Sequence, residues 1–189
     1  VFNSQSGAEM ASFFAYDPAF TGGISIAAAD MDADGIAEII TGAGPGGGPH
    51  VKVFSATDFH VFKEFMAYDP SFRNGVFVAV GDFLSDGKRE IITGAGPGGG
   101  PHVKIWDYAT LNIDGQFMAY GGVTDSSGKV VDQFFSCGVR VALADVNGDN
   151  INDILTGAGP GGGPHVKAFA GFNLELLLSL FAGDENDRN

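Results

Sequence analysis

The sequence TGAGPGGGPHVK occupies residues 41–52 and returns unchanged at residues 93–104 and 156–167. A segment written three times in 189 residues identifies an internal repeat, and such repeats indicate stacked copies of one structural unit. The copies begin 52 and then 63 residues apart, and the 11 additional residues lie between Tyr120 and Gly138. We therefore expect an expanded surface loop there, because surface loops accept insertions at little thermodynamic cost.

Each repeat also contains four short runs that are rich in Val, Ile, Phe and Thr and bounded by Gly, Pro, Asp and Asn, a pattern typical of β-strands. In the first repeat these runs are GISIAAAD, EIITG, HVKVF and EFMAYDP, and the fourth run has further copies in SFFAYDP and SLFAGDE near the two ends. Four-stranded units repeated at this spacing are typical of propeller blades. The sequence predicts an all-β fold, a β-propeller-like array of four-stranded antiparallel blades, with about three blades in this chain.

The repeat boundaries divide the chain into four parts. We expect residues 1–22 to supply a leading strand that completes a neighbouring blade or subunit. Blade 1 then covers residues 23–74, blade 2 covers residues 75–137 with its insert loop at 121–138, and blade 3 covers residues 138–189.

A second repeated element lies between the first and second strand of each repeat. It reads DMDADGIAE at residues 30–38, DFLSDGKRE at 82–90 and DVNGDNIND at 145–153. Side-chain oxygens at positions one, three, five and nine, with a carbonyl at position seven, form a donor set that suits Ca²⁺, which takes six to eight oxygen ligands. Gly35, Gly87 and Asn150 at position six permit the positive φ that a tight turn needs.

The predicted ligands differ between the three loops. They are Asp30, Asp32, Asp34, the carbonyl of Ile36 and Glu38 in the first loop; Asp82, Asp86 and Glu90 in the second; and Asp145, Asn147, Asp149, the carbonyl of Ile151 and Asp153 in the third. The second loop has Leu84 where a ligand belongs and adds Lys88 and Arg89, so we expect a weakened or empty site there. The alternative is that the loops are ordinary polar turns. For the second loop, the sequence favours calcium binding and a polar turn equally. Each loop runs directly into a strand, which favours a β-hairpin over an EF-hand.

The acidic loops followed by TGAGPGGGPHVKVF-like hairpins resemble the FG-GAP repeat (VCBS-type), the blade unit of the integrin α-subunit propeller and of many bacterial surface proteins. The resemblance covers nearly the whole chain. It implies propeller blades and structural Ca²⁺ bound by the residues named above, with two strong sites and one weakened site. It does not indicate a ligand.

Other readings of the repeated residues receive less support. The glycine segment is not a P-loop, because Pro49-His50-Val51 follows Gly48 where Gly-Lys-Ser/Thr is required. It is predicted to be a wide turn in which glycines permit close backbone approach. The equivalent histidines His50, His102 and His165 could bind a metal or an anion, although a packing role is favoured. No catalytic motif is recognisable, so we predict that the chain is not an enzyme.

Composition limits the partners. A net charge of −13 disfavours nucleic acid and suits cations. Cys137 is the single cysteine, which excludes an intrachain disulfide, and no apolar stretch is long enough to span a membrane.

The number of blades suggests that further copies are needed. Three blades do not close a propeller, which typically has four to eight, so we expect the chain to self-associate as an oligomer or filament or to form part of a larger propeller. The favoured function is a calcium-stabilised structural or adhesion protein that is extracellular or at a bacterial cell surface. The alternative is a module that binds a glycan or an extracellular protein, for which Tyr16, Tyr68 and Tyr120 are the candidate aromatic residues.

Overall fold

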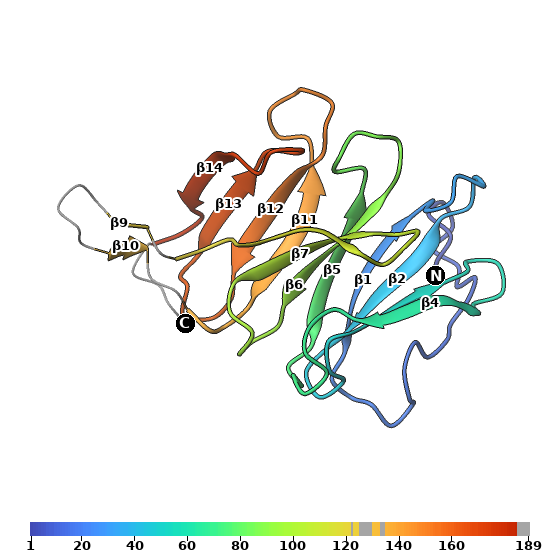
Figure 1. Cartoon of the computed structure of the whole chain (residues 1–189). Helices are drawn as coiled ribbons and strands as arrows, with labels where there is room; N and C mark the ends of the chain where they lie inside the picture. Colours follow the sequence, from blue (N-terminus) through green and yellow to red (C-terminus); the bar gives the residue numbers. More distant parts are fainter. Residues whose placement is uncertain (122, 125–129, 133–134, 185–189) are drawn as a thin grey trace.

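The computed structural model describes residues 1–121, 123–124, 130–132 and 135–184. The described residues contain no helix, and their strands form three four-stranded antiparallel sheets and one short hairpin (Figure 1). Sheet 1 contains β1 (Ile24–Ala29), β2 (Glu38–Ala43), β3 (His50–Phe54) and β4 (Val61–Met66). Sheet 2 contains β5 (Val76–Gly81), β6 (Glu90–Ala95), β7 (His102–Asp107) and β8 (Ile113–Met118). Sheet 3 contains β11 (Val139–Ala144), β12 (Asp153–Ala158), β13 (His165–Phe169) and β14 (Leu176–Phe181).

Each sheet is an up-and-down meander in which neighbouring strands pair in chain order. The first two strands form a tight hairpin in every sheet, with Ala29 opposite Glu38 in sheet 1 and Ala144 opposite Asp153 in sheet 3. The all-β prediction and the four antiparallel strands per repeat are therefore confirmed. The short hairpin of β9 (Val123–Thr124) and β10 (Val130–Asp132) lies in the predicted insert, part of which is outside the described residues.

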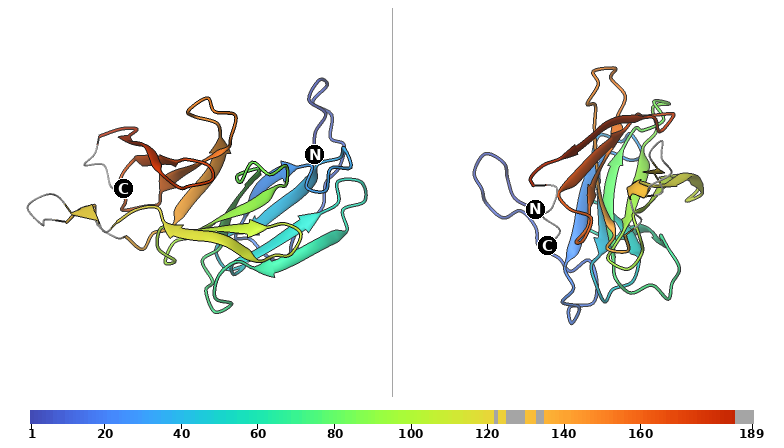
Figure 2. Two further views of the ribbon diagram at one scale, coloured as in Figure 1. Left: turned by 45° about the horizontal axis from the view of Figure 1, so that its top comes forward. Right: turned by 90° about the vertical axis from the view of Figure 1, so that its left-hand side faces the viewer.

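The three sheets lie in a row, with sheets 1 and 3 at opposite ends (Figures 1 and 2). Strand β5 contacts both β1 and β11, so the first strands of consecutive sheets are neighbours. The row is open within the described residues. A closed propeller, which the sequence resemblance implies, is therefore not shown by this chain.

The core lies between the sheets. We call the side of a sheet that faces the next sheet in the chain its front face, and the opposite side its back face. One cluster of buried residues joins the front of sheet 1 to the back of sheet 2 and includes Ile40, Val51 and Val76. A second cluster joins sheets 2 and 3 and includes Ile92, Val103 and Val139. Because equivalent residues fill both clusters, the two interfaces repeat one packing arrangement.

The strand after the acidic loop needs glycine because the next sheet approaches its backbone. A Cβ on Gly42 would collide with the carbonyl oxygen of Val76, and one on Gly94 would collide with that of Val139. The wide turn after this strand also needs glycine, because the segment before β1 approaches it and a Cβ on Gly44 would collide with the carbonyl oxygen of Gly22. This close backbone approach confirms the role predicted for the repeated glycines.

The segment after each fourth strand connects one sheet to the next. The hydroxyl of Tyr68 donates to the carbonyl oxygens of Thr93 (3.0 Å) and His102 (2.8 Å) as alternative acceptors. The equivalent residue, Tyr120, contacts the carbonyls of Thr156 and His165. These residues were predicted as part of the fourth strand, but β4 ends at Met66 and β8 at Met118, because the tyrosine leaves its own sheet to bind the following one.

The N-terminal segment lies against part of the back face of sheet 1, over β2 and β3. Residues 12–18 belong to no strand ladder, and residues 1–22 contain one isolated bridge, between Phe2 and Glu9. Tyr16 nevertheless bonds to the carbonyls of Thr41 and His50, as Tyr68 does one repeat later. The segment thus occupies the place that a preceding sheet's connection would take. Its role as a strand that completes another sheet stays a prediction.

Candidate metal centre

The three acidic loops join the first and second strands of the three sheets, and the two of them that follow β5 and β11 project from the same side of the row (Figure 1). Each loop leads directly into a strand, which confirms the predicted β-hairpin. Position six has a positive φ in all three loops, as predicted: 91° at Gly35, 83° at Gly87 and 66° at Asn150. Position four also has a positive φ, at Ala33 (63°), Ser85 (55°) and Gly148 (82°), and the glycine in the third loop is the sequence signal for it.

Hydrogen bonds to the backbone turn the carboxylates of the first loop inward. Asp30 accepts the N–H groups of Asp34 (3.1 Å) and Gly35 (2.9 Å), and Asp34 accepts that of Ile36 (2.7 Å). Glu38 at the start of β2 reaches back to the N–H of Met31 (2.7 Å) and is buried. The chain therefore wraps around its own acidic side chains, which a sequence of Asp residues at alternate positions permits.

Three predicted ligands meet in this loop. Asp30, Asp32 and Glu38 each place an oxygen within 4.8 Å of the other two, and no other Asp, Glu, His or Cys residues in the described part of the chain form such a group. Burial raises the pKa of Glu38, the N–H of Met31 opposes this rise, and the charges of Asp32 and Asp34 increase it. Burial and like charge both oppose ionisation, so a cation placed among these oxygens would relieve both penalties.

The first loop therefore fits a calcium ion by its donor type and by the convergence of its carboxylates. Asp34, another predicted ligand, lies in the same turn but outside the converging group, and its carboxylate accepts the N–H of Ile36.

The second loop does not fit the ion well. Lys88 Nζ lies 3.1 Å from the carboxylate of Asp86, so a side-chain ammonium group already stands beside one of the three acids. Asp82 keeps its bonds to the N–H groups of Asp86 and Gly87, and the buried Glu90 accepts that of Phe83. The loop holds its shape through the backbone, as the first loop does, with Leu84 in place of the central ligand.

The third loop keeps the donor set in a different arrangement. Asp145 accepts the N–H of Asn150 at 2.9 Å, and Asp149 accepts that of Ile151 at 2.8 Å. Asn147 donates its amide to Asp149 at 2.9 Å. Asp153 is fully buried, and its two carboxylate oxygens accept the N–H groups of Val146 and Gly171, both at 2.9 Å. Asp153 therefore also anchors the turn after β13.

Position eight links the loops of neighbouring sheets, a function that the sequence analysis missed. Arg89 Nε donates to the carbonyl of Asp30 (3.4 Å), and Asn152 Nδ2 donates to the carbonyl of Asp82 (3.2 Å). Each bond runs from position eight of one loop to position one of the preceding loop. The signal was present as two side chains with N–H donors at the same position, Arg89 and Asn152, whereas the first loop has Ala37 there.

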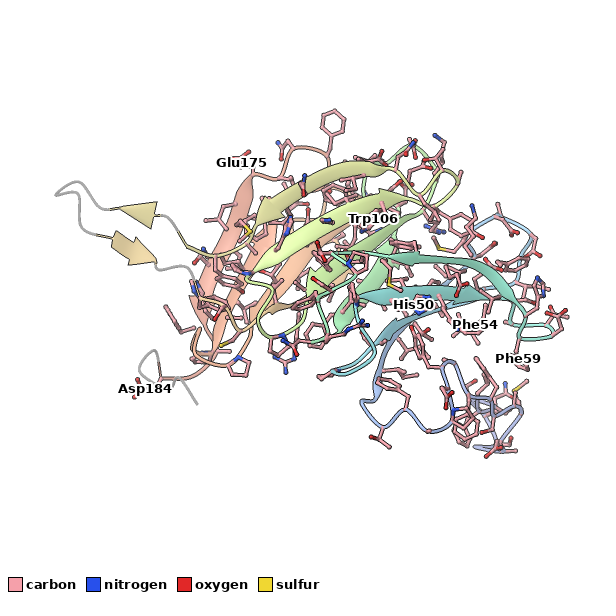
Figure 3. The ribbon with its side chains drawn as sticks, turned by 60° about the horizontal axis from the view of Figure 1, so that its bottom comes forward. His50, Phe54, Phe59, Trp106, Glu175 and Asp184 are labelled. Carbon is pink, nitrogen blue, oxygen red and sulfur yellow. The ribbon has the colours of Figure 1, made fainter. Side chains whose placement is uncertain are left out.

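The repeated histidines lie at the sheet interfaces. His50 packs edge-on against Tyr16 and bonds through Nε2 to Glu64 at 3.1 Å, and Figure 3 shows it on the part of sheet 1 beside the N-terminal segment. His102 packs in the same way against Tyr68 and bonds to Gln116 at 3.0 Å. These contacts support the packing role over a metal-binding or anion-binding role.

Comparison with known proteins gives limited information. No family model matches the chain, and no curated protein matches its sequence. Among solved structures, the crystal structure of the V. cholerae biofilm matrix protein Bap1 is similar over 83% of this chain and 28% of that chain, with a TM-score of 0.40 and 16% sequence identity. The chain therefore spans less than a third of the length of that protein. In the described part of the chain, no helix has the length and apolar character needed to cross a membrane.

Proposed function

We propose that this chain is a calcium-stabilised, non-enzymatic repeat protein of the FG-GAP type with an extracellular structural or adhesive role. In this role its sheets add to further sheets of the same kind, either by self-association or within a larger propeller. The observation that carries the proposal is the convergence of Asp30, Asp32 and Glu38 in a hairpin loop that also contacts the neighbouring sheet through Arg89. A bound ion would fix both the loop and the contact between two sheets.

The expected stabilisation follows from mass action. Calcium sites of extracellular modules have dissociation constants on the order of 10⁻⁴–10⁻³ M. With a constant of about 10⁻⁴ M, a free Ca²⁺ concentration of about 1 mM would stabilise the folded state by about 1.4 kcal/mol per site. For a chain of this size that corresponds to a rise in Tm of roughly 3–6 °C. A site of this affinity would be mostly filled at a free Ca²⁺ concentration of about 1 mM.

The alternative function, binding of a glycan or an extracellular protein, receives less support. Sugar binding through stacking needs exposed aromatic rings, but Tyr120 is 1% exposed and Tyr16 and Tyr68 are half-buried. Lys104 Nζ lies 4.9 Å from the centre of the Tyr68 ring, so a side chain of the protein already covers that face. The tyrosines therefore serve the sheet interfaces.

The test is a calcium titration followed by thermal unfolding. We expect Ca²⁺ to raise the Tm of the wild-type chain and EGTA to reverse this rise. Asp32→Asn keeps an oxygen that can accept the N–H of Asp34 while removing one charge, so it should abolish most of the calcium response of the first loop and leave the fold intact. Glu175→Gln, at an exposed acidic residue outside the loops, is the matched control and should respond like the wild type. Equal Tm values with calcium and EGTA would refute the calcium part of the proposal.

A further inference from the structure

The two ends of the row expose the two halves of the interface that is buried twice inside it. On the back face, Val76 and Val78 of sheet 2 are 3% and 5% exposed, and Val139 of sheet 3 is fully buried. The equivalent residues of sheet 1, Ile24 and Ile26, are 51% and 63% exposed. Sheet 1 thus has an apolar back face that no other sheet covers in the described part of the chain.

The front face shows the complementary pattern. Ile40 and Ile92 are fully buried in sheets 1 and 2, whereas Leu155 at the equivalent position in sheet 3 is partly exposed. Val51 and Val103 are also fully buried, and their equivalent, Val166, is partly exposed. The same change therefore occurs at two positions of the sheet 3 front face.

Glycine marks the same open end. A Cβ on Gly42 or Gly94 would collide with the first strand of the following sheet. The nearest atom to a Cβ on Gly157 is instead Cβ of Arg140, at 3.9 Å, which is ordinary contact within the same sheet. Among the residues that the structure describes, then, the front face of sheet 3 has the glycine and the open space that a following first strand requires.

We propose that a second copy of this chain docks head to tail, with the back face of its sheet 1 against the front face of sheet 3. The two faces are related as the faces of sheets 1 and 2 are, so β1 of the second copy lies over Gly157 with Ile24 and Ile26 turned toward sheet 3. Any copy of the chain carries both faces, and the interface continues one that the chain already builds twice. Such a contact is heterologous, so it generates a growing array or a closed ring. The inference rests on the assembly part of the proposed function, and it does not require calcium.

The N-terminal segment occupies part of this interface. The ring centroids of Phe13 and Phe54 are 5.1 Å apart. The equivalent ring pairs at the internal interfaces, Phe65 with Trp106 and Phe117 with Phe169, both have centroids 4.8 Å apart. Leu180 of sheet 3 is the equivalent of Phe65 and is 40% exposed. In the assembly, Leu180 of the preceding copy takes the place of Phe13, so the segment before Tyr16 competes with docking.

The C-terminal end of sheet 3 is compatible with this exchange. Gly183 stands where Tyr68 and Tyr120 stand in the earlier repeats, so sheet 3 brings no tyrosine to the next copy. The binding position on that copy is already filled by its own Tyr16. Each position between sheets therefore receives one tyrosine, and docking does not require Tyr16 to move.

Two variants separate the faces. Ile26→Glu places a charge on the back face at an exposed position, and Gly157→Val fills the open space on the front face, so both should fold and melt cooperatively. We expect the wild type to form larger species as its concentration rises in sedimentation velocity, and each variant alone to remain monomeric. An equimolar mixture of the two variants should form a discrete dimer, because one supplies an intact front face and the other an intact back face. The control Phe172→Glu, at a loop residue that is 75% exposed, should assemble like the wild type.

The competing segment has its own test. Phe13→Ser removes the ring from Phe54 and should shift assembly to lower protein concentration; a shift to higher concentration would overturn the competition. Three results would overturn the head-to-tail interface. The first is a mixture of Ile26→Glu and Gly157→Val that remains monomeric, and the second is association by either variant alone. The third is that both the wild type and Phe13→Ser remain monomeric. All samples are run with calcium and with EGTA at physiological salt, because the net charge of −13 opposes association. If the chain does not assemble but Ca²⁺ still raises its Tm, the head-to-tail proposal fails. If the chain assembles but Ca²⁺ does not change its Tm, the calcium proposal fails.

Discussion

Adding one methyl group at Gly94 and at Gly157 should have opposite effects on stability. The two glycines are equivalent in sequence, and neither has a positive φ, so alanine is compatible with the backbone at both positions. A Cβ on Gly94 would collide with the carbonyl oxygen of Val139 and lie 3.1 Å from Cγ1 of Val141. A Cβ on Gly157 would have its nearest neighbour at 3.9 Å. The pair therefore compares a closed and an open interface with the same chemical change.

The magnitudes follow from packing and chain entropy. Forcing a methyl group into a filled interface costs about 1–3 kcal/mol, so Gly94→Ala should lower the free energy of unfolding by that amount. Gly157→Ala meets no obstacle and should raise it by about 0.4–1 kcal/mol, because alanine restricts the unfolded chain. The two variants should then differ by roughly 1.4–4 kcal/mol, or about 3–16 °C in Tm for a chain of this length.

The assay is urea unfolding and thermal unfolding, followed by circular dichroism, at a protein concentration where the wild type sediments as a monomer. Gly42→Ala is the internal control and should behave like Gly94→Ala, because its Cβ would collide with the carbonyl oxygen of Val76. If Gly157→Ala destabilised the monomer as much as Gly94→Ala, the front face of sheet 3 would not be open. The stacking of equivalent interfaces described above would then be wrong.

Three further predictions follow from contacts inside the row. Burial raises the pKa of Tyr16 to about 12 and that of Tyr68 further, so the folded chain keeps these protons while the unfolded chain releases them near pH 10. The free energy of unfolding should therefore fall as the pH rises from 10 to 12. Tyr68→Phe should weaken this fall, as measured by the midpoints of urea unfolding. Asp153→Asn should cost about 1–3 kcal/mol in urea unfolding, because an amide has one oxygen for the two N–H donors that Asp153 accepts; no loss would contradict this anchoring role. Amide hydrogen exchange of the monomer should be slowest in sheet 2, because among the described residues it has another sheet on each face, whereas sheets 1 and 3 each have one. Equal protection of all three sheets would contradict the open row.

Much of the fold could be predicted because the same local sequence signals occur in all three repeats. Runs of β-branched residues between Gly, Pro and Asp clusters located most strands, and the identical glycine segments set the period. The ends of β4 and β8 were predicted too late, because the residues Ala67-Tyr68 continue the apolar pattern of a strand. What ends the strand is a bond from Tyr68 to carbonyls 25 and 34 residues away, and local sequence carries no information about such contacts.

The candidate site divides in a similar way. Alternating acids and a glycine at position six are local signals, and the structure shows the hairpin, the positive φ and the convergence of Asp30, Asp32 and Glu38. The positive φ of Ala33 is not indicated by alanine itself, which seldom adopts it; its signal is Gly148 at the equivalent position of the third loop. The link from Arg89 to Asp30 depends on the order of the sheets in space, which a single repeat does not reveal.

Two kinds of contact join one sheet to the next, and they are built from different parts of the repeat. The acidic loops connect through position eight at one end of the strands, whereas the front and back faces pack through apolar residues along their length. A cation in the first loop would stiffen the loop contact, since Arg89 bonds to the carbonyl of Asp30, a predicted ligand. The packing contact between the faces needs no ion, because it consists of apolar side chains and of a glycine that lets the backbone of a valine in the next sheet approach closely. Calcium would then act on the rigidity of the row, while Ile26 and Gly157 would determine whether the row can grow.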